Sequence, residues 1–229
     1  MIYGGKVRIG VLGGIGPEAT ANFYSKLIRK LQSEGFVKSN SDFPQIIINS
    51  IPAPELVGKI SEENLDIYVK GLKELDDIGI DFIVMVCNTI HIYYERLQKE
   101  VAAPIINLPK EVEFFLRKNK VSSIFVIGTQ ETINGELYKF KGINYSAPNA
   151  NDISILSKII FDFNMGVDKN LQITKVKNIC LKYLANKDCA VILGCTEFCT
   201  MLEDETFNKI NTIDVLVNSV IKTFLEMIK

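Results

Sequence analysis

One stretch of the chain decides the fold: Val7-Arg8-Ile9-Gly10-Val11-Leu12-Gly13-Gly14-Ile15-Gly16-Pro17-Glu18-Ala19-Thr20. Its first half is an apolar run rich in β-branched residues, which is typical of a buried strand. Residues 19–33 then show the spacing of an amphipathic helix, and Pro17 suits the first helical position. A strand that passes through glycines into a helix is half of a crossover unit, so the stretch predicts an α/β protein with parallel strands.

The same alternation of short apolar runs and longer amphipathic segments continues along the chain. Strands are predicted at residues 7–12, 45–50, 81–86, 122–127 and 190–194, with shorter ones at 104–107 and 143–147. Helices are predicted at residues 19–33, 62–78, 91–100, 109–119, 154–163, 168–186 and 214–228. The alternation predicts mainly parallel sheets flanked by helices.

The two halves of the sequence echo each other weakly. VRIGVLGG at 7–14 and SSIFVIGTQ at 122–130 each end a strand in a small-residue turn, whereas DFIVMVCNT at 81–89 and CAVILGCTE at 189–197 each end one in cysteine and threonine. We interpret the echo as two similar α/β lobes, residues 1–103 and 104–211, with the helix at 214–228 packed back on the first. Because ligands of open α/β sheets bind beyond the carboxyl ends of strands, we expect an active site in the cleft between the lobes. The alternative is two unrelated buried strands that end in cysteine by chance.

The composition narrows the class of function. Hydrophobic residues make up 47% of the chain and 26 basic residues balance 27 acidic ones, so nucleic acid and anionic membranes are not expected partners. The longest apolar run, residues 82–94, is too short to span a bilayer. The opening MIYGGKVRIG has no signal-peptide pattern, and the five cysteines are typical of reduced thiols, so we expect a cytoplasmic protein.

The glycine-rich turn allows more than one interpretation. GIGPEA at 14–19 formally matches the dinucleotide-binding pattern, with a strand before it and a helix after it. That pattern also needs a carboxylate at the end of the second strand, where this chain has Asn49-Ser50. Glycines also let backbone approach a ligand, and free N–H groups at a helix start attract a carboxylate. We therefore favour a carboxylate-binding turn, with a tight turn that binds nothing as the alternative.

Cys87 and Cys195 each follow a strand at the start of an expected helix. The N–H groups and the dipole of a helix start favour thiolate over thiol, so we expect the pKa of both thiols to fall below about 8.5. The alternative for each is a small buried hydrophobe, which is how we interpret Cys180, Cys189 and Cys199.

A zinc site is the other chemistry that these residues allow. His91 is the only histidine, and Cys87-x-x-x-His91 with Cys195-x-x-x-Cys199 would supply three thiolates and one imidazole. Structural zinc is usually held by cysteines two residues apart, and these pairs do not have that spacing. We therefore expect no metal.

Four motifs taken together resemble the aspartate/glutamate racemase family. They are GGIGPEAT at 13–20, CNTIH at 87–91, GT at 128–129 and GCTE at 194–197, in this order and at these separations. The first motif resembles the aspartate racemase branch more than the glutamate racemase branch, and the similarity covers essentially the whole chain. Glutamate racemases, hydantoin racemases and maleate isomerase share the architecture.

The resemblance implies a cofactor-independent racemase, expected to be a homodimer, that interconverts L- and D-aspartate or L- and D-glutamate. Cys87 and Cys195 would flank the α-carbon, where one thiolate removes the proton and the other thiol returns a proton to the opposite face. Glu197 would orient its turn or neutralise local charge. The residues implied to hold the substrate are Gly14, Ile15, Gly16, Asn88, Thr89, Thr129 and Thr196.

Three positions depart from the family's pattern. Members that recognise aspartate commonly place an arginine shortly after the stretch that matches 49–54, where this chain has Glu55-Leu56, and Asn164 stands where a lysine is expected. The common Asp-Thr-x-x-x-His near the C-terminus is NTIDVL at 211–216. Because Leu56 and Asn164 replace the usual partners of a side-chain carboxylate, we expect weak discrimination between aspartate and other amino acids.

Three other functions compete with an acidic-amino-acid racemase. The nearest is a related two-cysteine racemase or isomerase that acts on a neutral amino acid or another small carboxylate. A nucleotide-binding oxidoreductase and a thiol- or metal-binding protein without enzymatic activity are the others. Exchange of deuterium into Cα of amino acids would favour the racemases over the last two.

Overall fold

The computed structural model describes residues 7–54, 60–184 and 189–228, and its strands form two parallel sheets. In the first sheet the order is β2-β1-β3. The central strand β1 (Arg8–Gly13) pairs with β2 (Gln45–Ser50) and with β3 (Phe82–Met85). β1 and β3 are buried, as their apolar sequences require, whereas β2 is partly exposed at the edge. The connecting helices are α1 (Pro17–Ser33) and α2 (Glu62–Asp77).

The second sheet has the strand order β5-β4-β6-β7. All of its pairings are parallel. Its strands are β4 (Ser123–Gly128), β5 (Asn144–Ser146), β6 (Ala190–Gly194) and β7 (Lys209–Asn211). The helices between them are α5 (Gln130–Asn134), α6 (Ala150–Asn164), α7 (Lys169–Leu184) and α8 (Thr196–Met201).

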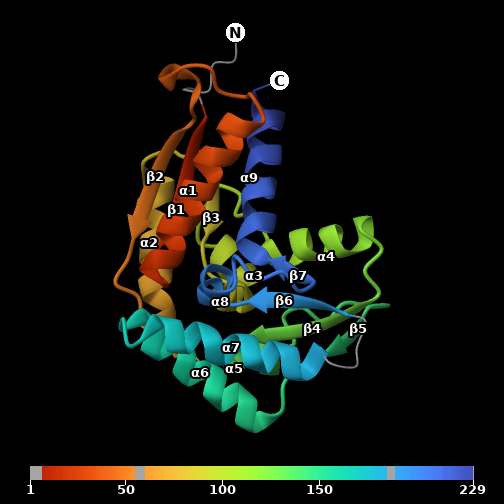
Figure 1. Cartoon of the computed structure of the whole chain (residues 1–229). Helices are drawn as coiled ribbons and strands as arrows, with labels where there is room; N and C mark the ends of the chain where they lie inside the picture. Colours follow the sequence, from red (N-terminus) through yellow and green to blue (C-terminus); the bar gives the residue numbers. More distant parts are fainter. Residues whose placement is uncertain (1–6, 55–59, 185–188, 229) are drawn as a thin grey trace.

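The two sheets are joined through helices. α9 (Thr212–Met227) lies beside α1 and packs against α4 (Leu108–Lys118), while α6 and α7 pack on each other on the opposite side of the second sheet (Figure 1). The remaining short elements are the 3₁₀ helices η2 (Asn40–Asp42) and η3 (Thr89–Tyr93) and the helix α3 (Tyr94–Gln98). This arrangement brings the carboxyl ends of both sheets toward one region of the molecule.

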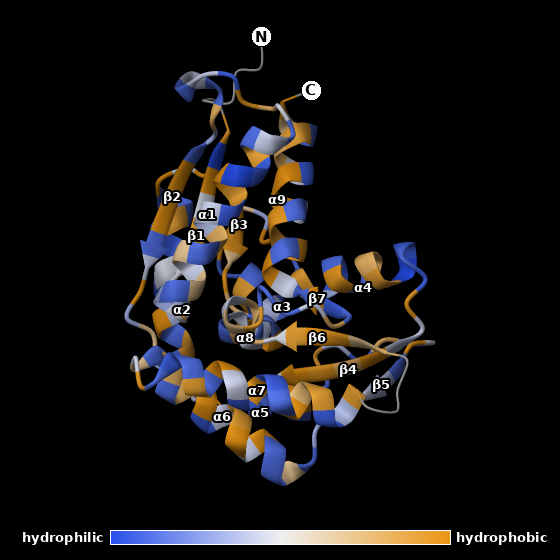
Figure 2. Cartoon of the chain, viewed as in Figure 1, coloured by the Kyte–Doolittle hydropathy of each residue, from blue (hydrophilic) through white to orange (hydrophobic). Residues whose placement is uncertain are grey.

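One hydrophobic core extends across both sheets. It joins Phe23 and Leu27 of α1 to Val126 of β4, Leu193 of β6 and Phe224 of α9, all of them almost fully buried. The inner strands are correspondingly apolar, and the helices alternate apolar and polar faces (Figure 2). None of the helices in the described ranges is long and apolar enough to cross a membrane.

The predicted fold class is confirmed, with local differences. Around residues 104–107 only Ile105 pairs with the sheet, as an isolated bridge to Ile83, because Asn107 already caps α4 by accepting from the Lys110 N–H. The helix predicted at 91–100 begins earlier and is divided into η3 and α3. The short elements α5 and β7 were not predicted. The lobe boundary between residues 103 and 104 stays a prediction.

Candidate active site

A cavity of about 510 Å³ lies at the carboxyl ends of the strands. The turns after β1, β2 and β3 line it from the first sheet, and the turns after β4 and β6 line it from the second together with one face of α6. Its volume is in the usual range for a small-molecule site. All of the predicted site residues line it, although their roles stay predictions. The lining residues are Gly14, Ile15, Gly16, Pro17, Ser50, Ile51, Pro52, Ala53, Pro54, Cys87, Asn88, Thr89, Thr129, Gln130, Ser157, Ile160, Phe161, Asn164, Met165, Cys195, Thr196 and Glu197.

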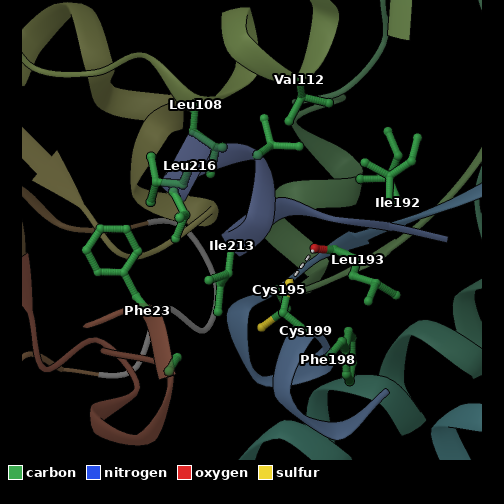
Figure 3. Packing of buried hydrophobic residues seen from close by; sticks show 14 of the residues in the cluster. Phe23, Leu108, Val112, Ile192, Leu193, Cys195, Phe198, Cys199, Ile213 and Leu216 are labelled. Carbon is green, nitrogen blue, oxygen red and sulfur yellow. Dashed lines mark hydrogen bonds between the residues drawn. The ribbon is translucent and has the colours of Figure 1, made fainter. Parts of the chain in front are cut away.

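The two candidate cysteines enter the cavity from different sheets. Cys87 follows β3 and precedes η3, and Cys195 follows β6 as the N-cap residue of α8. They are only 6% and 5% exposed, respectively. Figure 3 shows Cys195 within the apolar cluster that also contains Leu193 and Phe198. Each thiol is therefore largely removed from water.

Burial changes the expected acidity of both thiols. It raises the pKa of the Cys87 thiol to about 12, although the N–H groups of Ile90 and Thr89 act in the opposite direction. Burial also raises the pKa of the Cys195 thiol well above its ordinary value, and the Glu197 carboxylate raises it further. The expectation that the helix starts would lower these pKa values is therefore wrong, because desolvation outweighs the N–H donors.

Glu197 makes the two cysteines chemically unequal. The Cys195 thiol donates to Glu197 Oε2 at 2.8 Å, and the Thr196 hydroxyl donates to the same oxygen at 3.2 Å. The Asn164 amide donates to the other oxygen, Oε1, at 3.3 Å. The Glu197 carboxylate raises the pKa of both thiols, but only Cys195 also donates a hydrogen bond to it, whereas the N–H groups of Ile90 and Thr89 act to lower the pKa of Cys87.

The glycine-rich turn brings the first sheet close to Glu197. Gly14 and Gly16 both have positive φ, 83° and 87°, and Gly16 is the N-cap of α1. A Cβ on Gly16 would lie 2.2 Å from Glu197 Oε1, so only glycine allows this approach. A carboxylate thus lies where a dinucleotide phosphate would meet the start of α1, which argues against nucleotide binding.

Asn88 carries an unpaired donor at the cavity. Its Oδ1 accepts a hydrogen bond from the hydroxyl of the fully buried Tyr138, which fixes the orientation of the amide. Its Nδ2 is buried and, within the described residues, has no hydrogen-bond partner. An unpaired buried donor is costly, so this amide has an unused hydrogen bond beside the cavity that Asn88 lines.

Three threonine hydroxyls connect the two halves of the cavity. Thr89 Oγ1 lies 2.9 Å from Thr129 Oγ1 and 3.1 Å from Thr132 Oγ1. The Thr129 hydroxyl also donates to Thr132 Oγ1 at 3.1 Å, and its oxygen caps α5 by accepting from the Thr132 N–H. The network holds the turn after β3 against the turn after β4.

The two residues considered as further zinc ligands lie outside the cavity lining. Burial lowers the pKa of His91 to about 4, and its ring stacks on Tyr94 with centroids 6.3 Å apart. The Cys199 thiol donates to the Leu193 carbonyl at 3.4 Å and lies 3.3 Å from Thr212 Oγ1. The described residues contain no group of three or more His, Cys, Asp or Glu arranged to hold a metal ion.

The family model described as Asp/Glu/Hydantoin racemase matches residues 12–220. The chain belongs to the Asp/Glu/hydantoin racemase family. The match runs from the end of β1 into α9, so the family assignment includes every turn that lines the cavity.

Relatives in this family are named racemases, which are isomerases. The broad specificity amino-acid racemase RacX of Bacillus subtilis (strain 168) is 30% identical over 133 residues, which cover 57% of this chain and 58% of that protein. A glutamate racemase of Aquifex aeolicus (strain VF5) is 32% identical over 166 residues, 69% of this chain and 63% of that protein. The matched segments thus span less than two thirds of each of these two relatives.

A solved structure, that of an aspartate racemase of Picrophilus torridus, has a TM-score of 0.79 at 25% identity. The structural match covers 95% of this chain and 94% of the Picrophilus torridus chain. The three relatives therefore differ in the substrates for which they are named.

The positions that depart from the racemase pattern have different surroundings. Asn164 lies in the cavity wall beside Glu197, whereas Glu55 and Leu56 lie outside the described residues. Asn211 caps α9 by accepting from the N–H groups of Ile213 and Asp214. The NTIDVL segment thus forms the capped start of α9.

Sequence reasoning missed several parts of this racemase-family site. Tyr138 and Thr132 belong to no recognised motif, and only contacts made in the folded chain connect them to Asn88 and Thr89. The apolar face of α6 was also missed. Its helical spacing is visible in the sequence, but the same spacing is expected of a face that packs on a core.

Proposed function

We propose that this family member is a cofactor-independent amino-acid racemase in which Cys87 and Cys195 move the α-proton. The observation that carries the proposal is that two buried cysteines, one from each sheet, open into one cavity. A two-base racemisation uses an acid and a base on opposite faces of Cα, and two thiols can exchange these roles as the reaction reverses. The family's racemases support the same reaction type.

The proton transfers balance without an outside reagent. One thiolate takes the proton from Cα, forming an S–H bond and leaving the electron pair of the broken C–H bond on Cα and the carboxylate. The opposite thiol then gives its proton to the other face of Cα, which restores the C–H bond with inverted configuration. The cysteines have then exchanged protonation states, so the reverse reaction begins from the state in which the forward reaction ends.

The surroundings of the thiols favour Cys87 as the base in the resting site. Glu197 accepts a hydrogen bond from the Cys195 thiol, which keeps the proton there. The N–H groups of Thr89 and Ile90 oppose the effect of burial at Cys87 and stabilise its thiolate. An α-ammonium group in the cavity would lower the pKa of both thiols, by about 1–3 units each for a positive charge within 4–6 Å. Substrate binding thus promotes the ionisation that catalysis needs.

The proposed binding groups are arranged around this proton path. Asn88 lines the cavity and has an unpaired Nδ2 donor, so we assign its amide to the substrate's α-carboxylate. The hydroxyls of Thr89, Thr129 and Thr196 and the backbone of the glycine-rich turn line the same cavity. Donors aimed at that carboxylate gain strength as negative charge develops on it, so they stabilise the carbanion-like transition state more than the bound substrate.

The test is replacement of each cysteine, read by racemisation and by exchange of deuterium from solvent into Cα. Cys87→Ala and Cys195→Ala should each abolish racemisation in both directions, while circular dichroism shows a folded protein. Cys189→Ala is the matched control, because Cys189 is 5% exposed but lies outside the cavity lining. Racemisation within about tenfold of the unmodified enzyme in either active-site variant would exclude the two-base mechanism.

A further inference from the structure

One face of α6 forms an apolar wall of the cavity. Ser157, Ile160, Phe161 and Asn164 are spaced i, i+3, i+4 and i+7, which places them on the same side of the helix. Met165 follows directly and also lines the cavity. We call the three residues Ile160, Phe161 and Met165 the apolar wall.

The apolar wall exposes large side chains where a ligand would reach them. Phe161 is 46% exposed and Met165 is 58% exposed. Exposed apolar side chains that gather in a concave site commonly mark a binding surface, because covering them removes apolar area from water. The turn after β2 adds further apolar lining with Ile51 and Pro52.

The described lining of the cavity carries a charge that is unfavourable for an acidic side chain. Among the described lining residues none is lysine or arginine, and Glu197 is the only acid. Of the lysines on or next to α6, Lys158 is paired with Asp162 at 3.1 Å and Lys169 is paired with Glu18. A second substrate carboxylate would thus lose water and face Glu197, and none of the described lining residues would offer it a cation.

We propose that the substrate's side chain is neutral and apolar, of the size of leucine, methionine or phenylalanine, and that it packs on Ile160, Phe161 and Met165. This inference rests on the proposed function, since it assumes that Cα lies between Cys87 and Cys195. The polar turns then hold the amino-acid head group, and the apolar wall selects the side chain. The wall residues are specificity-determining rather than catalytic.

The first experiment separates binding from catalysis. Calorimetry gives the Kd of leucine, methionine, phenylalanine, alanine, asparagine and aspartate, and deuterium exchange at Cα gives their turnover. We expect leucine, methionine and phenylalanine to bind at least tenfold more tightly than alanine and aspartate. Tighter binding of aspartate, or no binding of any apolar amino acid, overturns the inference. Tight binding of the apolar amino acids without exchange supports the inference but removes the proposed function.

The second experiment changes the apolar wall directly. Phe161→Arg should weaken leucine and phenylalanine binding at least tenfold and strengthen aspartate binding, because it places a cation where apolar surface was. Ile155→Arg is the matched control, since Ile155 is on the same helix and 40% exposed but does not line the cavity. Equal effects of the two variants, or no change in the ratio of leucine to aspartate affinity in Phe161→Arg, contradict the proposal.

Discussion

Replacing Glu197 with glutamine should make Cys195 more acidic. In the native site the Glu197 carboxylate accepts the thiol hydrogen bond at 2.8 Å and raises the pKa of Cys195 through its negative charge. A neighbouring charge at this range typically shifts a pKa by about 1–3 units. Glutamine keeps the size of the side chain and an oxygen that accepts hydrogen bonds, so the change removes mainly the charge.

The size of the pKa shift at Cys195 gives the size of the effect that the assay should detect. A fall of 1–3 units multiplies the Cys195 thiolate fraction at neutral pH by about 10 to 1,000, equivalent to about 1.4–4 kcal/mol. Because only the thiolate reacts with iodoacetamide, the alkylation rate of Cys195 should rise by a similar factor. Tandem mass spectrometry, in which fragment ions locate the modified residue, distinguishes Cys195 from Cys189 and Cys199 in the same tryptic peptide. The alkaline limb of the pH profile for racemisation should move toward lower pH as well.

A matched glutamate controls for indirect effects. Glu111 also lies in the first turn of its helix, α4, and accepts from the Ser219 hydroxyl at 2.9 Å, but it does not line the cavity. Glu111→Gln should leave the alkylation rate of Cys195 unchanged. If Glu197→Gln folds normally and alkylates no faster than the unmodified enzyme, the assignment of Cys195 as the resting thiol is refuted.

Four other outcomes are expected. Burial lowers the pKa of His91 from 6.5 to about 4, so the free energy of unfolding should fall as pH drops from about 6.5 toward 4, by up to about 3 kcal/mol. In urea unfolding, His91→Phe should lack this dependence of the unfolding free energy on pH. Tyr138→Phe removes the donor to Asn88 Oδ1 and should lower kcat/KM about tenfold or more, because the amide loses its fixed orientation; unchanged kinetics would count against Asn88 as a binding group. Gly16→Ala places a Cβ 2.2 Å from a carboxylate oxygen and should cost activity and melting temperature, whereas Gly142→Ala, at φ +81° with nothing within 4 Å, should cost only backbone strain. Light scattering at micromolar concentration should give the mass of a homodimer, as the family resemblance implies, and a monomer would contradict it.

Local sequence patterns were sufficient to predict the turns after the buried strands, which line the cavity. A buried parallel strand must be apolar along its length, so β1, β4 and β6 are readable as runs such as VRIGVL and AVILG. The residue after such a strand lies at the carboxyl edge of the sheet, which is why Cys87 and Cys195 were recognised as candidate site residues without any knowledge of contacts. The strand at 104–107 was overpredicted because capping of α4 by Asn107 competes with sheet pairing there.

Only the tertiary structure decided how those residues behave. The sign of the thiol pKa shift depends on how much water the fold removes, and no motif contains that information. The pairing of Tyr138 with Asn88 joins positions 50 residues apart in sequence. The sequence by itself thus determined which side chains reach the edge of each sheet, because strand and turn formation depend on neighbouring residues. The fold decided their protonation and the apolar wall of α6 beside them, because desolvation and cavity shape depend on atoms brought together from distant parts of the chain.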